Sequence, residues 1–453
     1  MTTTARPISS RDRILVAGLF LAVSMSAFEI TAVLTALPSI VSELNGERFY
    51  GATLAVYLLA SLISVVASGE LADRRGPSLP FAFGVGLFLA GLLVAGTAQS
   101  PLIVVLGRAM QGMGAGAQTT LTYVVIRRAI HEDVQPKIYA VMSAAWVLPS
   151  LIAPLIAGWI TDTFGWRWVF LGLTVPAALV GILVVSQTRE LGRPDAPAVR
   201  SRLPMALALS LGAAAVLTGS TNRNLTLALP LGIGGLVVCI VAIRSLLPVG
   251  TYSLRTGLPS AVASRFLATF AFGCVDSFVP FAAKNIHGVR SAAVQGFMII
   301  GAALTWTAGQ AYAAKRAGDM NPSRYVRLGF GFLGLGALLT SSVVAPQVPL
   351  WAVFLSWMVG GLGMGLLFNP TTVVAMSASS DGDAGLVGGQ LSMADSLGFA
   401  GAATLGGTFI AIADRTALNL RDALFLTFSV AIATCFIGLF ASRKVTLSPL
   451  LSS

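Results

Sequence analysis

Three charged residues lie inside long apolar stretches of this sequence: Glu29, Arg108 and Asp395. A charged side chain in such a stretch costs free energy unless it faces a partner or water. A carboxyl group held in an apolar setting can bind and release a proton or attract a cation. These three residues are therefore the candidates for proton coupling.

Glu29 and Arg108 are expected at the same depth of a membrane. At about 1.5 Å per residue, Glu29 lies about 12 Å before the outer end of a predicted helix over 14–37, and Arg108 about 10 Å after the outer start of one over 101–126. If these helices adjoin, the two side chains neutralise one another, and proton binding at Glu29 releases Arg108 or its surrounding water. A static ion pair that holds the bundle together is the alternative.

Asp395 lies near the middle of a predicted helix over 385–412, which contains no basic residue. This carboxyl group could be protonated at rest, bind a cation or carry a second proton. A hydrogen-bonded structural role fits the sequence equally well.

Polar and aromatic residues of other predicted helices are candidates for a substrate cavity: Gln111, Trp146, Asp276, Gln310 and Asn369. Gln111 shares a helical face with Arg108. Asp276 is close to an outer helix end, where it would be a water-exposed vestibule residue or a partner for Lys284. Helix packing is the alternative for the others.

The composition requires a membrane. Of 453 residues, 55% are hydrophobic and 10% charged, and the mean hydropathy is +0.83. A soluble chain carries about a quarter charged residues, so the apolar excess here must face lipid. The net charge of +11 is spread over short loops, which argues against a nucleic-acid partner.

The sequence holds no pattern typical of a metal site, a cofactor or an enzyme. Its cysteines, Cys239, Cys274 and Cys435, lie far apart in apolar runs, and His131 and His287 fall in different loops. It contains no Gly-Lys-Ser/Thr phosphate-binding loop. We expect no metal, no cofactor and no enzymatic activity, so work on a solute must draw on a gradient or a partner.

A membrane-spanning helix needs about 20 mostly apolar residues. Fourteen stretches qualify, and they run approximately over 14–37, 50–70, 79–98, 101–126, 138–160, 168–187, 203–220, 225–243, 261–283, 291–312, 326–345, 349–370, 385–412 and 422–442. Leaving out the two helices over 203–220 and 225–243 would not change which side of the membrane the other helix ends face. Their two uninterrupted apolar runs favour fourteen spans over twelve.

Basic residues orient these helices. Lys and Arg are about three times as frequent on the side of the N-terminus, which predicts that both termini are cytoplasmic. Arg265 is counted with the cytoplasmic set, which leaves Arg108 alone within a span.

A faint internal repeat divides the chain into two halves. The Leu-Pro pair at 37–38 matches the Val-Pro pair at 279–280, and the glycine run at 112–116 matches the run at 361–365. Their common order and similar offset indicate duplication of a helical unit. We expect a six-helix bundle over 1–202, an inserted two-helix hairpin over 203–244 and a second six-helix bundle over 245–453.

The loop after the second predicted helix reads Gly69-Glu70-Leu71-Ala72-Asp73-Arg74-Arg75-Gly76. This stretch resembles the most specific motif of the major facilitator superfamily, although the usual basic pair after it is replaced by Pro77-Ser78. We expect Asp73 to cap a helix N-terminus and Arg74 to stay available for a carboxylate or a lipid phosphate. Gly69, Asp73, Arg74 and Gly76 would then form a cytoplasmic gate.

Further motifs resemble the fourteen-helix drug:proton antiporter subfamily of that superfamily. Residues 108–114 are similar to the Arg-x-x-Gln-Gly-x-Gly signature of the superfamily, and Glu29 takes the place of the acid in the first-helix pattern of its drug:proton antiporter branch. In the fifth-helix signature, Ala153 and Ala157 replace glycines. The resemblance implies an all-α polytopic membrane protein with the major facilitator fold, two six-helix bundles and two inserted helices.

The sequence therefore predicts a secondary transporter of the cell membrane that exports amphipathic or cationic small molecules in exchange for protons. Export, as the direction, rests on the subfamily resemblance. Export of a lipid or a secondary metabolite on the same fold is the alternative, favoured by the departures at Ala153, Ala157 and Pro77. A membrane protein that does not transport is a much less favoured alternative. The expected partners are the substrate, protons and the bilayer, and we expect a monomer.

Overall fold

The computed structural model describes residues 9–131, 134–189, 191–192, 201, 203–221, 224–316, 321–377, 384–414 and 418–446, and their regular structure is entirely helical. The α-helices are α1 Ser10–Glu43, α2 Tyr50–Arg75, α3 Ser78–Gly96, α4 Pro101–Ala129, α5 Gln135–Phe164, α6 Arg167–Thr188, α7 Leu203–Thr221, α8 Leu225–Leu246, α9 Leu258–Asp276, α10 Val279–Asn285, α11 Ala292–Lys315, α12 Pro322–Thr340, α13 Leu350–Ser377, α14 Ala384–Ala413 and α15 Leu420–Ala441. Short 3-10 helices are η1 Glu47–Phe49, η3 Ser341–Val344 and η4 Ser442–Lys444.

Each of the fourteen predicted stretches is helical. The ninth is broken, because α9 ends at Asp276 and α10 begins at Val279 with Pro280 in its first turn, where a missing N–H is tolerated. The end predicted for the first helix at Leu37 is wrong, since α1 continues through Pro38 to Glu43. A proline removes one hydrogen bond, and the packing of a long apolar helix makes up for that loss.

Twelve helical segments of the described chain are long and apolar enough to cross a membrane by length and hydropathy alone. The other two predicted spans are α4 and α7. The mean hydropathy of α4 is lowered by buried polar residues, among them Arg108, Gln111 and Gln118, although the helix has 29 residues. Both helices pack against spanning neighbours, α4 against α2 and α3, and α7 against α8 and α2. The fold therefore has fourteen transmembrane helices.

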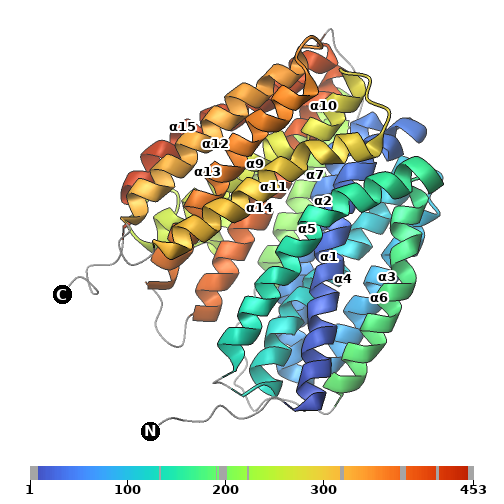
Figure 1. The fold of residues 1–453 in the computed structure, drawn as a ribbon, viewed down its shortest axis with the longest axis vertical. Coiled ribbons are helices and arrows are strands. Elements are labelled where there is room, and N and C mark those ends of the chain that lie inside the picture. Colours follow the sequence, from blue (N-terminus) through green and yellow to red (C-terminus); the bar gives the residue numbers. More distant parts are fainter. Residues whose placement is uncertain are drawn as a thin grey trace.

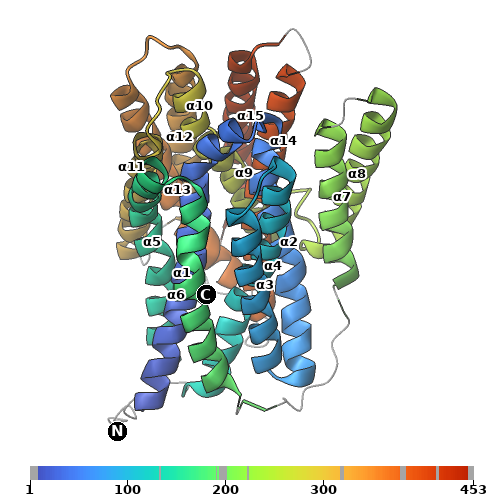
Figure 2. The ribbon, with the colours of Figure 1, turned by 90° about the vertical axis from the view of Figure 1, so that its right-hand side faces the viewer.

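The helices form two bundles with a hairpin at one side (Figures 1 and 2). Helices α1 to α6 make one bundle, and α9 to α15 make the other. Helices α7 and α8 stand apart as an antiparallel pair, and α7 contacts both α2 and α14. Only 11% of an 18-residue apolar segment of α8 is buried, whereas 78% of such a segment of α9 and α10 is buried. The hairpin of α7 and α8 therefore lies at the periphery.

The two glycine runs of the predicted repeat make equivalent contacts in the two bundles. A Cβ at Gly112 would lie 2.9 Å from the Cα of Tyr57 on α2, and one at Gly361 would lie 2.6 Å from the Cα of Ala302 on α11. Real Cβ atoms do not approach other atoms this closely, so glycine is required for α4 to touch α2 and for α13 to touch α11.

The side of the molecule at which α1 begins is called the N side below. The two bundles are joined on the opposite side. The Tyr50 hydroxyl donates to the carbonyl of Ser277 at 2.7 Å, and Lys284 Nζ donates to the carbonyl of Pro38 at 2.9 Å. Asp162 of α5 accepts hydrogen bonds of 2.7 Å from Ser291 Oγ and from the backbone N–H at the start of α11. Figure 1 shows the bundles meeting at the end opposite the N side and diverging toward the N side.

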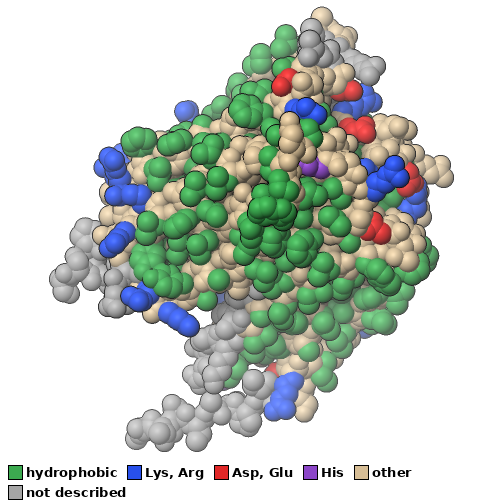
Figure 3. Space-filling model, turned by 45° about the horizontal axis from the view of Figure 1, so that its top comes forward, with side chains coloured by type: hydrophobic (Ala, Val, Ile, Leu, Met, Phe, Trp, Pro, Cys, Tyr) green, Lys and Arg blue, Asp and Glu red, His purple; other side chains and the backbone are tan. Residues whose placement is uncertain are grey.

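The surface has the pattern of a membrane protein. Figure 3 shows one face on which hydrophobic side chains cover the middle, whereas Lys, Arg, Asp and Glu gather toward the edges. Large apolar side chains such as Ile182, Leu211 and Phe83 are more than 60% exposed, which lipid would cover.

Candidate functional site

A buried ion pair joins α1 to α4 in the first bundle. Arg108 Nη1 donates to Glu29 Oε1, and the same nitrogen donates to Gln111 Oε1 at 2.8 Å. The two charged side chains are 2% and 0% exposed. Arg108 and Gln111 face the same way because they are three residues apart on a helix. The structure thus brings together three of the residues that the sequence singled out.

This cluster is only partly satisfied by hydrogen bonds. Glu29 Oε2, Arg108 Nε, Gln111 Nε2 and the Tyr57 hydroxyl are buried, and within the described residues none of them has a hydrogen-bond partner. A carboxylate with one free oxygen can take a proton there without first breaking its contact to Arg108. The arrangement can therefore exchange a proton while the guanidinium stays close.

A second ion pair lies in the other bundle, and sequence reasoning missed half of it. Arg265 Nε donates to Asp395 Oδ1 at 2.8 Å, and Arg265 Nη2 donates to Asp395 Oδ2. The ion pair is therefore bidentate. Nη1 donates to Thr372 Oγ1 at 2.9 Å. The assignment of Arg265 to a cytoplasmic loop is wrong, because it lies inside α9 with a side chain 4% exposed. Its position within the predicted span 261–283 was the signal that could have revealed it.

The remaining cavity candidates fall at separate places. Asn369 Nδ2 donates to the backbone carbonyl of Gln310 at 2.9 Å, which joins α13 to α11. Asp276 accepts a hydrogen bond of 2.8 Å from Trp357 Nε1, whereas the expected alternative partner, Lys284, donates to Pro38 instead. Trp146 is 38% exposed on α5.

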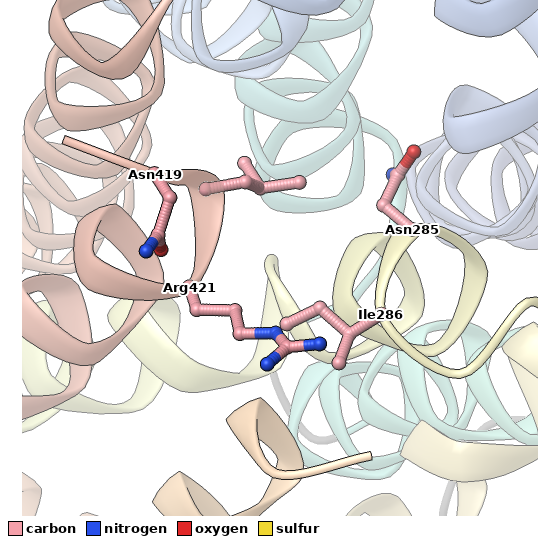
Figure 4. Close-up of a pocket in the computed structure, with 5 residues that line it drawn as sticks. Asn285, Ile286, Asn419 and Arg421 are labelled. Atoms are coloured by element: carbon pink, nitrogen blue, oxygen red, sulfur yellow. The ribbon is translucent and has the colours of Figure 1, made fainter. Parts of the chain in front are cut away.

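A pocket of about 270 Å³ opens between α10 and α15 (Figure 4). Its lining residues are Asn285, Ile286, Asn419, Leu420 and Arg421. The pocket lies at the ends of these helices opposite the N side and contains none of the predicted site residues.

The predicted gate lies at the N side of the first bundle. Gly76 has φ +82°, a conformation that favours glycine, and Arg74 is exposed. The prediction that Asp73 caps a helix N-terminus is wrong, because α2 extends to Arg75 and α3 begins without a side-chain cap. Asp73 instead lies 3.6 Å from Arg128 at the end of α4. Gly69 lies one turn earlier on α2, where an added Cβ would be in ordinary van der Waals contact, 3.8 Å from Thr120 Cγ2.

Two bundles of membrane-spanning helices, each with an ion pair buried between its helices, are the architecture of a membrane transporter. Residues 19–264, more than half of the chain, match the sequence model described as Major Facilitator Superfamily. The chain belongs to this superfamily and is a membrane transporter.

Named relatives cover nearly the whole chain. The multidrug transporter protein MdtP of Bacillus subtilis (strain 168) is 25% identical over 434 residues, which are 92% of this chain and 77% of that protein. The probable multidrug-efflux transporter Rv1634 of Mycobacterium tuberculosis (strain ATCC 25618 / H37Rv) is 25% identical over 435 residues, 90% of this chain and 89% of that protein. The chain thus resembles drug-efflux members of the superfamily.

Solved structures show the same fold. A crystal structure of a POT family transporter in complex with 5-aminolevulinic acid has a TM-score of 0.70 at 16% identity, covering 95% of this chain and 96% of that one. An auto-inhibited POT family peptide transporter gives a TM-score of 0.70 at 14% identity, covering 96% and 98%. At these identities the likeness concerns the fold alone.

Proposed function

We propose that this protein exports amphipathic or cationic small molecules across the cell membrane in exchange for protons. The observation that carries the proposal is the Glu29–Arg108 pair, a carboxylate and a guanidinium that are both buried in the first bundle. Packing alone seldom needs a charge inside a membrane, and a carboxylate is the group that can take up and release a proton there. The multidrug names of the relatives support a drug-like substrate.

The proposed orientation places both termini in the cytoplasm. Lys and Arg are concentrated at the N side, including Arg74, Arg75, Arg127, Arg128 and Lys444. The hydrogen bonds that join the bundles lie on the other side, so the described conformation would be closed to the exterior. Alternating access would then require these contacts to break and new ones to form at the N side.

The charges in the second bundle bear on the substrate class. Asp395 is neutralised by Arg265, so this pair has no net charge to offer a cation. Asp276 accepts its hydrogen bond from the uncharged indole N–H of Trp357 and not from a basic side chain. Trp357 and Trp306 both pack against Phe272, with ring centroids 4.9 and 5.1 Å from it. An acid beside aromatic rings suits a lipophilic cation.

Substrate-driven proton movement tests the proposal. Inverted membrane vesicles with an acidic interior would contain the wild-type chain, and vesicles without the chain would be the control. The compounds added are a lipophilic cation, a neutral amphipathic drug and an anionic lipid. We expect the cation, and more weakly the neutral drug, to drive protons out of the vesicles. Absence of proton movement with all of them would contradict coupled antiport.

Export of a lipid or a secondary metabolite is the second candidate. Ala153 and Ala157, which replace glycines of the antiporter signature, are both 0% exposed on α5. Their methyl groups thus lie between helices at positions where the antiporter signature has glycines. Transport of the anionic lipid, but not of the cation, in the same vesicles would favour this candidate.

A further inference from the structure

The ring of Tyr57 lies directly against the guanidinium of the first ion pair. Arg108 Cζ is 4.2 Å from the centroid of the ring, well within the range of a cation–π contact. Tyr57 is 3% exposed, so water does not weaken this attraction. The guanidinium is therefore held by Glu29 from α1, by Gln111 on its own helix and by Tyr57 from α2.

The glycine run of α4 sets the position of this ring. Gly112 packs directly on the backbone of Tyr57, where a Cβ would lie 2.9 Å from its Cα. Gly116 packs in the same way on Ser61, one turn further along α2. The helices touch at these points, and the Tyr57 ring lies beside Arg108, which is one turn away from Gly112 on α4.

The ring, and not the hydroxyl, makes the contact. The Tyr57 hydroxyl is buried and has no hydrogen-bond partner within the described residues. The second bundle repeats the arrangement with a residue that has no hydroxyl, since Arg265 Cζ lies 3.3 Å from the centroid of Phe368. Both ion pairs therefore rest on an aromatic face.

We propose that Tyr57 is a positioning residue for proton coupling, whose ring holds the Arg108 guanidinium in place while Glu29 carries a proton. This inference rests on the proposed function. When Glu29 is protonated, Arg108 loses its counter-ion but cannot lose its own proton, so a buried cation remains. The face of the ring and the Gln111 oxygen then compensate that charge. The ring thereby lowers the cost of protonating Glu29.

The charged and titratable groups coupled at this site come from three helices. They are Glu29 on α1, Arg108 on α4 and Tyr57 on α2. A guanidinium carries its charge at every working pH, and a tyrosine within an apolar interface stays neutral. The pH dependence of the site is therefore that of Glu29, modified by the other two groups.

The first test varies the electrostatics of the ring while keeping its shape. Substrate-driven proton release is measured against pH for the wild type, for Tyr57→Phe and for a trifluorinated phenylalanine at position 57, whose ring face no longer attracts a cation. We expect the phenylalanine variant to keep the wild-type pH profile. With the fluorinated ring, half-maximal release should shift about one pH unit toward acid, which corresponds to about 1.4 kcal/mol.

Tyr252→Leu is the matched control for this test. Tyr252 also faces an arginine, Arg244, with its centroid 5.7 Å from Cζ, but it is 58% exposed and far from Glu29 in sequence. Its replacement should leave the profile unchanged. An unshifted profile with the fluorinated ring, or an equal shift in Tyr57→Phe, would overturn the inference.

A second readout separates this inference from the proposed function. A double-mutant cycle compares the melting temperature of the purified chain carrying Tyr57→Leu, Glu29→Gln or both, with the fluorinated residue replacing leucine if that variant does not fold. We expect the loss of the ring to cost more in the Glu29→Gln background, where Arg108 has no carboxylate. Additive effects would overturn the role of Tyr57, even if the wild type moves no protons and the proposed function fails.

Discussion

The guanidinium of Arg265 forms an ion pair with the carboxylate of Asp395, with 2.8 Å between Arg265 Nε and Asp395 Oδ1, although the two residues are 130 positions apart in the sequence. The Asp395 side chain is 22% exposed, whereas Glu29 in the other pair is fully buried. In the described conformation the two carboxylates thus differ in their access to water. Such a difference is what two sites loaded at different stages of a transport cycle would require.

Removal of either member of the second pair should have unequal costs. Asp395→Asn leaves a buried guanidinium that cannot lose its charge, and we expect it to destabilise the protein by about 3 kcal/mol. Arg265→Gln leaves a carboxyl group that can become neutral by taking a proton, so its cost should be smaller and should decrease as the pH falls. Melting temperatures in detergent at neutral and acidic pH measure both effects.

The double variant Arg265→Gln with Asp395→Asn distinguishes stability from function. It contains no charge at this site and should regain part of the lost stability. We predict that it does not couple substrate movement to protons. Wild-type transport by this variant would show that the pair is structural and that Asp395 has no part in coupling.

Packing of α4 on α2 should be sensitive to a single methyl group. Gly112→Ala places a Cβ against the backbone of Tyr57, where neither helix can yield without moving, and we expect a loss of about 2 kcal/mol. Gly86→Ala on α3 is the control, because a Cβ there has open space around it. Alanine favours a helix more than glycine does, so the control should be neutral or slightly stabilising. Equal melting temperatures for the two variants would contradict the close packing.

The hydrogen bonds that Asp162 accepts from the start of α11 should favour closure of the side opposite the N side. Asp162→Asn removes a carboxylate from a helix N-terminus, an interaction worth about 1 kcal/mol, so the open population should rise about fivefold. Spin labels at Glu47 and Gln347, which are exposed on different bundles at this side, report the separation.

Asp422→Asn is the control for this experiment. Asp422 caps α15 through a capping box with Asn419, so it has the same chemistry within one bundle. Its replacement should lower stability without changing the distance distribution. A shift as large as that of Asp162→Asn would mean that the effect is not specific to the contact between bundles.

Much of the fold followed from the sequence, because the length and hydropathy of a spanning helix are local properties. The fourteen stretches and the equivalent glycine runs at 112–116 and 361–365 were predicted in this way. The continuation of α1 beyond Pro38 was not, since packing along a long helix outweighs one lost hydrogen bond.

The candidate site was predicted only where both partners had visible signals. Glu29 and Arg108 each interrupt an apolar helix at a matching depth, and the structure places them in contact. Arg265 lies only about 6 Å from the start of the predicted span 261–283, so it was counted with the loop charges. Its pairing with Asp395 depends on how α9 packs against α14, which no local pattern specifies. Asp73 was assigned to a cap because α2 was taken to end five residues too early.

The most direct test of the account compares two glutamates of one helix. Proton release from acid-loaded inverted vesicles is measured after addition of a lipophilic cation, for the wild type, Glu29→Gln and Glu43→Gln. Glu43 also pairs with an arginine, since Arg167 Nη1 donates to it at 2.6 Å, but its side chain is 52% exposed at the end of α1. We predict release by the wild type and Glu43→Gln, and none by Glu29→Gln present in the membrane at the same level. Release by Glu29→Gln at the wild-type rate would contradict the assignment of Glu29 as the proton carrier.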